Sequence, residues 1–462
     1  MSEDDKGVDL VLRGGSIHVL DEHDTRAEAI AVRSGRIVAT GSNADMSELI
    51  GARTRVIELE GRTVLPGIND SHLHASWLGG MWPATVFGGG PQQPGPLVTN
   101  REERRAALLK AGDLLASLGI TSYTEPGIGP GEDAGPTGSF GREVLDVYRE
   151  LAAEGLLRSR VTLLLLFGLI DGPSTVDDIV RGIREADTSS PNDDLLHIPG
   201  IKIFGDGIPP MRNAYIHGTY IDGTHGALLI DGDDDGEREA NLRLAIRTAH
   251  EAGLQVAVHA TGDHTIDVVC DAVREAQGDG SSDLRHYLVH ADMVSESAAA
   301  ALAAHDMGAT VQAGIASFAG EWADSAFEPS LEPGEPEPWT GRRLLDAGVN
   351  ITLSSDSPIL SPDWRTEVAA ADRLLGESDD PRARMHELLR RYTAVPAWQD
   401  HAESWKGTLE AGKIADLVVL SSDPDDVGAA GLPDVAIELT FLGGEVVFDA
   451  SSESVESAVP SA

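Results

Sequence analysis

Cysteine is almost absent from this chain of 462 residues, and long apolar runs are absent altogether. The single cysteine, Cys270, excludes an intrachain disulfide and a metal cluster held by thiolates. No stretch reaches the roughly 18 continuous apolar residues that are typical of a membrane-spanning helix. The first residues are acidic and polar, unlike a secretory signal, and we therefore expect a cytoplasmic protein.

Positive charge is also scarce. The chain has 76 aspartate and glutamate residues against 35 lysine and arginine residues, and its formal net charge is −41. This charge would repel nucleic acid and anionic membranes, so we expect neither as a partner. One interpretation is a surface that attracts cationic ligands. The acidic residues are spread over the whole chain, however, which favours a halophilic surface that stays hydrated in multimolar salt.

The two ends of the chain share one pattern of residues, and the middle has another. Short β-branched runs broken by glycine, such as "DLVLRGGSIHVL" and "IELTFLGGEVVFDA", predict antiparallel hairpins at both ends. The middle alternates apolar strands with helical segments. We therefore predict an α/β protein with a small β-sandwich built from residues 1–63 and 403–450. Residues 64–402 would form a (β/α)8 TIM barrel, and residues 451–462 a tail.

The middle region supplies eight candidate parallel strands in succession. Helical patterns separate most of them, as at Arg101–Leu118, Glu237–Ala252 and Trp339–Ala347. A glycine follows each of these helices, where a helix end favours a left-handed residue: Gly119, Gly253 and Gly348. The predicted strands end near Ile68, Tyr123, Phe167, Phe204, His259, His290, Gln312 and Ser355.

Side chains that can bind a metal ion follow several of these predicted strands. His72 and His74 lie two residues apart after the first strand, so both imidazoles can point the same way. Taken alone, each candidate could instead have a structural role, as a hydrogen-bonded core histidine, a paired lysine or a helix cap. The remaining candidates lie on strands four, five, six and eight: Lys202, His259, His290 and Asp356. Their joint position at one end of one barrel predicts a metal-dependent active site.

The order of these residues resembles the amidohydrolase superfamily, and most closely its amidohydrolase 3 (YtcJ-like) branch. The resemblance runs from about Val8 to about Asp449. It rests on the stretches "LPGINDSHLHAS", "GIKIFGDG", "VAVHATGD", "RHYLVHADMV", "LLDAGVNITLSSDSP" and "GTLEAGKIADLVVLSSDP".

The resemblance implies a site for two divalent metal ions. His72 and His74 would hold the more buried ion, and His259 and His290 the more exposed one. Lys202 would be carboxylated by CO2, and its carbamate would bridge the two ions. Asp356 would bind the buried ion and act as the proton shuttle.

The chemistry of these ligands agrees with that assignment. Imidazole nitrogen and carboxylate-type oxygen suit Zn²⁺, with manganese or iron as alternatives. A lysine beside two cations has a lowered pKa, and a carbamate converts it into an anionic ligand. Two metal ions that share a water lower its pKa, and one of them can polarise the scissile carbonyl.

The substrate pocket is less well defined by the sequence. Relatives usually carry a long insertion between the first two barrel strands, which this chain lacks. Trp77 and Trp82, in the short loop that remains, could line an apolar subsite or pack against the barrel rim. His286 matches a basic or histidine position common in the family and is a further candidate for substrate contact. We expect the glycine- and proline-rich segment Gly88–Pro96 to form a loop on the active face.

The leading functional hypothesis is hydrolysis of an amide-type C–N bond in a small molecule, such as an N-acyl, N-formyl or cyclic amide. A deaminase of a heterocyclic amine is the first alternative. Deaminase relatives place a glutamate three residues after the strand-five histidine, where this chain has Gly262. A non-catalytic metal-binding scaffold is the second alternative, although none of the six ligand residues is missing. A homodimer remains open.

Overall fold

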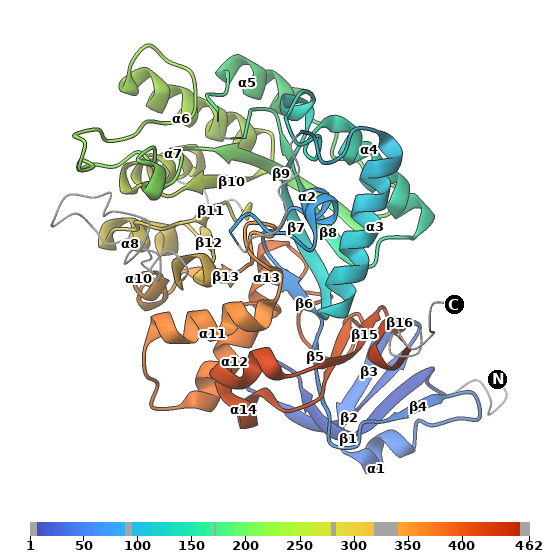
Figure 1. Ribbon diagram of the computed structural model, residues 1–462. Coiled ribbons are helices and arrows are strands. Elements are labelled where there is room, and N and C mark those ends of the chain that lie inside the picture. The colour runs from blue at the N-terminus through green and yellow to red at the C-terminus, as the bar shows by residue number, and fades with distance from the viewer. Residues whose placement is uncertain (1–6, 88–94, 171, 279–282, 318–340, 453–462) are drawn as a thin grey trace.

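The computed structural model describes residues 7–87, 95–170, 172–278, 283–317 and 341–452 (Figure 1). These residues form two sheets of eight strands each, one parallel and one built from both ends of the chain. Among the described helices, none is long and apolar enough to cross a membrane. The parallel sheet and its helices make up the upper part of Figure 1, and the second sheet lies below them.

The parallel sheet confirms the predicted barrel. Its strands pair in chain order, and all pairings are parallel. The last seam is closed only by an isolated bridge between Leu73 and Ser357, so the barrel is nearly closed. All residues of the strand Arg160–Leu166 are buried, as expected where helices cover the outer face. The eight strands are β6 (Ile68–Asp70), β7 (Ile120–Ile128), β8 (Arg160–Leu166), β9 (Leu196–Phe204), β10 (Gln255–Ala260), β11 (Tyr287–His290), β12 (Gly308–Val311) and β13 (Asn350–Leu353).

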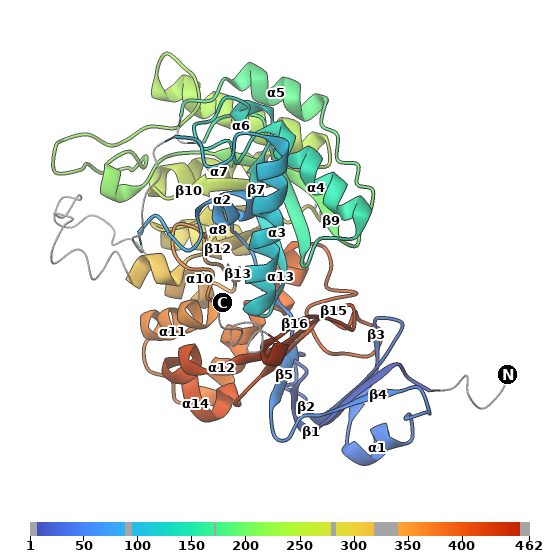
Figure 2. The same ribbon diagram turned by 45° about the vertical axis from the view of Figure 1, so that its right-hand side comes forward.

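Helices alternate with these strands and surround the barrel (Figures 1 and 2). Side-chain caps fix the starts of several helices; Asn100, for example, accepts from the Glu103 N–H at the start of α3. The three glycines predicted to follow helices do adopt left-handed backbone, with φ of 75° at Gly119, 73° at Gly253 and 79° at Gly348. Trp339, the predicted start of one helix, lies outside the described residues, as does most of the loop predicted at 88–96.

The helices of the barrel region are α2 (Ala75–Met81), α3 (Arg101–Ser117), α4 (Arg142–Glu154), α5 (Val176–Arg184), α6 (Asp235–Glu251), α7 (Asp263–Gln277), α8 (Glu296–Ala304), α10 (Gly341–Asp346), α11 (Trp364–Leu375), α12 (Pro381–Arg390) and α13 (Ala394–Gln399). Two further helices accompany the second sheet: α1 (Asn43–Ser47) and α14 (Pro424–Gly431).

The second sheet confirms that the two termini fold together. Ile37 near one edge and Phe441 near the other belong to the same apolar core, so the sheet folds over on itself. The division into domains at the predicted residues remains a prediction. The strands are β1 (Leu10–His18), β2 (Arg26–Arg33), β3 (Arg36–Gly41), β4 (Arg55–Glu58), β5 (Thr63–Pro66), β14 (Leu417–Leu420), β15 (Ile437–Leu442) and β16 (Glu445–Asp449).

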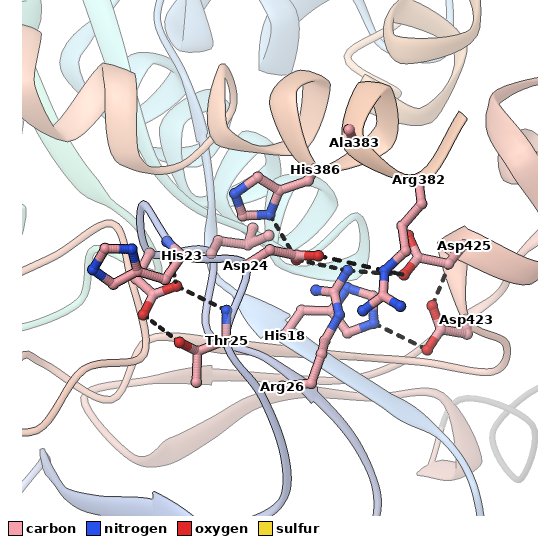
Figure 3. Close-up of polar contacts among 12 residues, drawn as sticks. His18, His23, Asp24, Thr25, Arg26, Arg382, Ala383, His386, Asp423 and Asp425 are labelled. Atoms are coloured by element: carbon pink, nitrogen blue, oxygen red, sulfur yellow. Dashed lines mark hydrogen bonds and ion pairs between the residues drawn. The ribbon is translucent and has the colours of Figure 1, made fainter. Parts of the chain in front are cut away.

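A network of ion pairs joins this sheet to helices α12 and α14 (Figure 3). His18 is fully buried, and its Nε2 lies 2.9 Å from Oδ2 of Asp423. Arg26 donates to Asp425 over 2.8 Å, and Nε of Arg382 lies 3.4 Å from the same carboxylate. His18 and the two carboxylates are close enough together to hold a cation. Because two guanidinium groups already neutralise Asp425, we interpret the cluster as a structural network.

Helix α11 carries a buried carboxyl group that makes stability depend on pH. Glu367 is 1% exposed and accepts the Gly314 N–H over 2.8 Å. Burial raises the pKa of this carboxyl group from 4.5 to about 8. Between these two values the folded chain holds a proton that the unfolded chain releases. The contribution of Glu367 to the free energy of unfolding therefore falls as the pH rises from about 4.5 to about 8.

We expect Glu367→Gln to remove this contribution. The variant should gain stability relative to the wild type between pH 5 and pH 8, on the order of 1–3 kcal/mol. Denaturant unfolding of both proteins at several pH values measures the difference. Asp372→Asn, on the same helix, is the matched control for the loss of one carboxylate. A constant difference between wild type and Glu367→Gln across this pH range would contradict the assignment.

Candidate metal centre

The seam between β6 and β13 brings three possible ligands together. The Asp356 N–H donates to the His72 carbonyl over 2.9 Å, and the His74 N–H donates to the Ser357 carbonyl over 2.7 Å. Oδ1 of Asp356 then lies 3.2 Å from Nε2 of His72 and 3.6 Å from Nε2 of His74. The three candidate ligand atoms all lie within 4.8 Å of one another, and all three residues are buried. This donor set fits one divalent metal ion.

The backbone is shaped for this arrangement. Asp356 has a φ of 53° and His290 a φ of 73°, a left-handed conformation that is uncommon for residues other than glycine. Asp70, which is fully buried, accepts the N–H groups of His72 and Ser355 and so ties the two strand ends together. Such conformations persist where surrounding contacts hold them, and they are concentrated at functional sites.

Glu125 of β7 orients His74. Its carboxylate lies 3.2 Å from Nδ1 of His74, and it also accepts the Ala75 N–H over 2.8 Å and the Tyr148 hydroxyl over 2.7 Å. A carboxylate at this position makes Nδ1 of His74 the protonated nitrogen, which leaves the lone pair of Nε2 for a metal ion. Histidine ligands of metal ions commonly have such an acceptor behind them.

His259 and His290 are oriented in the same manner. Nε2 of His259 lies 3.0 Å from the Gly207 carbonyl, so Nε2 carries the proton and Nδ1 has the free lone pair. Nδ1 of His290 lies 2.7 Å from Oε1 of Gln312, whose amide donates to Ser354 over 2.8 Å. His290 therefore has its lone pair on Nε2. The rings of His259 and His290 are 4.4 Å apart, close enough to share an ion.

Lys202 of β9 is 2% exposed, and its Nζ has no hydrogen-bond partner among the described residues. Its Nζ lies 5.1 Å from the centre of the Phe204 ring. Burial lowers the pKa of Lys202 from 10.5 to about 7, although the charge of Asp356 opposes the shift. Such an amine is largely neutral at mildly alkaline pH and retains the lone pair that reaction with CO2 requires. An orphaned buried nitrogen in this position fits a group that becomes a ligand after modification.

The imidazoles are also held in the neutral form that binds metals. Burial lowers the pKa of His72 and His290 well below 6.5, and it lowers the pKa of His259 to about 4. Neighbouring positive groups, Lys202 among them, lower the same pKa values further. The rings of His72 and His290 lie 5.5 Å apart, which connects the β6 side of the site to the β11 side. All six predicted ligand residues thus converge at the carboxyl ends of the strands.

The structure places the three residues predicted to contact the substrate in different surroundings. Trp77 lies beside the site, with its ring centre 6.0 Å from that of His74. Trp82 packs against the main apolar core, and its carbonyl accepts from Lys110. His286 is not brought to the site: it precedes β11, at the strand end opposite His290, and accepts the Val256 N–H over 2.9 Å. Four residues of extended chain separate the two histidines, so His286 does not support a substrate contact.

Two residues of the site, Gln312 and Phe140, were not predicted from the sequence. Gln312 was identified only as the end of a strand, and Phe140 belongs to a glycine-rich loop. The Phe140 ring lies 5.2 Å from His74 and 5.7 Å from Trp77, so the three rings form one aromatic wall. Gln312 lies at the end of a predicted barrel strand, and polar residues at that end of a barrel commonly belong to the active site. Its position in the sequence could therefore have indicated its role.

We expect Glu125→Gln to weaken metal binding by about tenfold to a hundredfold, because the amide no longer fixes the His74 tautomer. Competition of the purified protein with a chelator measures this affinity directly. Tyr148→Phe is the matched control, since it removes a hydrogen bond to Glu125 and leaves the contact with His74 in place. An unchanged affinity in Glu125→Gln, with an intact fold, would remove Glu125 from this role.

Curated relatives are similar to the chain over nearly its whole length. Protein LONG AFTER FAR-RED 3 of Arabidopsis thaliana is 24% identical over 552 residues, covering 95% of this chain and 91% of the relative. The N-substituted formamide deformylase of Arthrobacter pascens is 23% identical, covering 96% and 98%. The putative amidohydrolase YtcJ of Bacillus subtilis is also 23% identical, covering 96% and 99%. These alignments are longer than the chain, so the relatives carry residues that it lacks.

Solved structures show the same fold. An uncharacterized metal-dependent hydrolase of Pyrococcus horikoshii superposes with a TM-score of 0.70 at 18% identity, covering 91% of this chain and 99% of the other. A family model described as "Amidohydrolase family" matches residues 90–448, a span that begins after His72 and His74 and includes the other four ligand candidates. Because that match covers most of the chain, the protein belongs to the amidohydrolase family.

Proposed function

We propose that this protein hydrolyses an amide-type C–N bond of a small molecule, such as an N-acyl, N-formyl or cyclic amide. Membership of the amidohydrolase family and the formamide deformylase among its relatives support this reaction class. The observation that carries the proposal is the convergence of four buried imidazoles, one aspartate and one buried lysine whose Nζ has no hydrogen-bond partner in the described chain.

The proposed cofactor is a pair of divalent metal ions, with Zn²⁺ expected and manganese or iron as alternatives. His72, His74 and Asp356 would hold one ion, and His259 and His290 the other. Lys202, converted to a carbamate by CO2, would bridge them. Bound metal supplies Lewis acidity, which lowers the pKa of a water molecule and polarises a carbonyl group.

The chain's own groups would manage the proton and the substrate. Asp356 would accept a proton from the attacking water as the new C–O bond forms, and it would return that proton to the leaving nitrogen as the C–N bond breaks. The products are a carboxylic acid and an amine. Because Oδ1 of Asp356 lies next to two imidazoles, the carboxylate is placed to reach a water bound among them.

The aromatic wall is proposed to contact the substrate. Trp77 is partly exposed, and its ring centre lies 6.0 Å from that of His74 and 5.7 Å from that of Phe140. An indole at this position can stack against a planar amide or an aromatic substituent. Trp82 packs against the core, which agrees both with an apolar subsite and with packing against the barrel rim. A substrate contact by Trp82 therefore remains a prediction.

The substrate panel that tests the proposal contains N-formyl and N-acyl amines, cyclic amides and aminated heterocycles. We would assay protein loaded with zinc or manganese in high salt with bicarbonate, and detect amine, acid and ammonia separately. Release of amine and acid supports the proposal. Release of ammonia from a heterocycle would favour the deaminase alternative, although Gly262 lies where deaminase relatives have a glutamate.

A non-catalytic scaffold is the remaining alternative. The name of the Arabidopsis relative states no reaction, which keeps this alternative open. Two bound metal ions without turnover on any member of the panel would favour it. The cytoplasmic location, the halophilic surface and the homodimer likewise stay predictions.

A further inference from the structure

An apolar pocket lies between strands β12 and β13 and helices α10, α11 and α12. Its cavity volume is about 80 Å³. A cavity of roughly 150 Å³ can hold benzene, so this one has room for a short hydrocarbon group of about three or four carbon atoms. Small side chains create the space, among them Ala316 and Ala371, which are each 5% exposed. Buried Ile351 and Leu388 form part of the wall.

The pocket adjoins the metal centre through two shared residues. His290 and Gln312 line it, and these two residues are joined by the contact of 2.7 Å described above. The centre of the His290 ring also lies 4.4 Å from that of His259. A group that is held in the pocket would therefore lie next to one of the candidate metal ligands.

The lining defines what the pocket can accept. Among the described residues that line it none is acidic, and its two arginines both donate hydrogen bonds to neighbouring groups, although Nε of Arg391 has no partner in the described part of the chain. Arg391 donates to Glu387 over 2.7 Å and to the Ile351 carbonyl over 3.0 Å. Arg342 donates to the Leu375 carbonyl over 3.0 Å. An uncharged hydrocarbon group suits such walls, whereas a polar group would lose its hydration without new partners.

We propose that this pocket is a substrate subsite that takes an unbranched hydrocarbon group of the molecule whose C–N bond is cleaved. The inference rests on the proposed function and adds the class of substrate: amides with an apolar chain on the carbonyl side or on the nitrogen side. Each methylene that enters the pocket would strengthen binding by up to about fourfold.

The test uses metal-loaded full-length protein and two substrate series. In one series the acyl group lengthens from formyl to butanoyl on a constant amine. In the other, a formyl group is constant and the N-alkyl group lengthens. For the wild type we expect KM to fall by about tenfold or more along one series, which also identifies the side of the bond that occupies the pocket.

Pocket variants give the decisive comparison. Ala371→Leu fills the space and should raise KM about tenfold for the longest substrate, while it changes the shortest by less than about twofold. Ala371→Ser keeps the space and should resemble the wild type. Leu375→Ala enlarges the pocket and should shift the preference towards longer chains. Butylamine and butanoate should raise the melting temperature of the wild type more than that of Ala371→Leu.

The outcomes separate this inference from the proposed function. Hydrolysis without any dependence on chain length, or with the same dependence in all variants, would overturn the subsite and leave the function intact. A lower melting temperature in Ala371→Leu with an unchanged chain-length profile would mean that the protein's own chain fills the space, which also overturns it. If no amide is hydrolysed while butylamine or butanoate stabilises only the wild type and Ala371→Ser, the proposed function is wrong and the apolar subsite is supported.

Discussion

Asp356→Asn is expected to lower kcat/KM by about a thousandfold or more without unfolding the protein. The amide retains the size of the carboxylate, so the backbone contacts between Asp356 and His72 should survive. It cannot accept the proton of the attacking water, and it is a weaker metal ligand than a carboxylate. Both losses act on the transition state, which is why a large decrease in turnover should accompany a small change in stability.

The measurement is steady-state kinetics on the best substrate of the panel, together with the metal content of the same preparation. Asp372→Asn is the control, because it changes the net charge equally on a helix that follows the same strand. Activity of Asp356→Asn within about tenfold of the wild type would exclude Asp356 from the proton relay.

Lys202→Ala is expected to reduce bound metal from about two ions to one or none and to abolish measurable turnover. The physical reason is that Lys202 is the only lysine among the described residues of the site, and a bridging anion is needed between ions that otherwise repel each other. Alanine leaves a cavity where the lysine stem was, so some loss of stability should accompany the loss of metal.

Lys110→Ala provides the matched control, since Lys110 is exposed and contacts only the Trp82 carbonyl in the described part of the chain. Metal analysis after exhaustive dialysis gives the first readout. Mass spectrometry or carbon NMR of protein prepared with labelled bicarbonate gives the second, because only a modified Lys202 retains the label. Full metal content and near-normal rates in Lys202→Ala would contradict the carbamate bridge.

The sequence predicted the architecture well because its signals are local and repeated. Eight apolar runs separated by helical patterns need no information about distant contacts, and glycine after a helix reports a backbone requirement at that residue alone. The end of a parallel strand also places a side chain on a known face of the barrel. His72, His74 and Asp356 could therefore be assigned to one site before their distances were known.

The surroundings of the site could not be predicted in the same way. Gln312 and Phe140 acquire their roles only when strands far apart in the chain become neighbours. His286 was predicted to contact the substrate because it matches a family position, yet the extended chain of β11 places it at the strand end opposite His290. The apolar pocket depends on how α11 packs, which no short pattern in the sequence specifies.

Removal and return of the metal tests the central claim most directly. The purified protein would be assayed for amide hydrolysis as isolated, after chelation, and after addition of Zn²⁺ or Mn²⁺ with bicarbonate. The account predicts that chelation abolishes hydrolysis and that the metal restores it in the wild type but not in Lys202→Ala. Hydrolysis that continues at an unchanged rate in metal-free protein would contradict it.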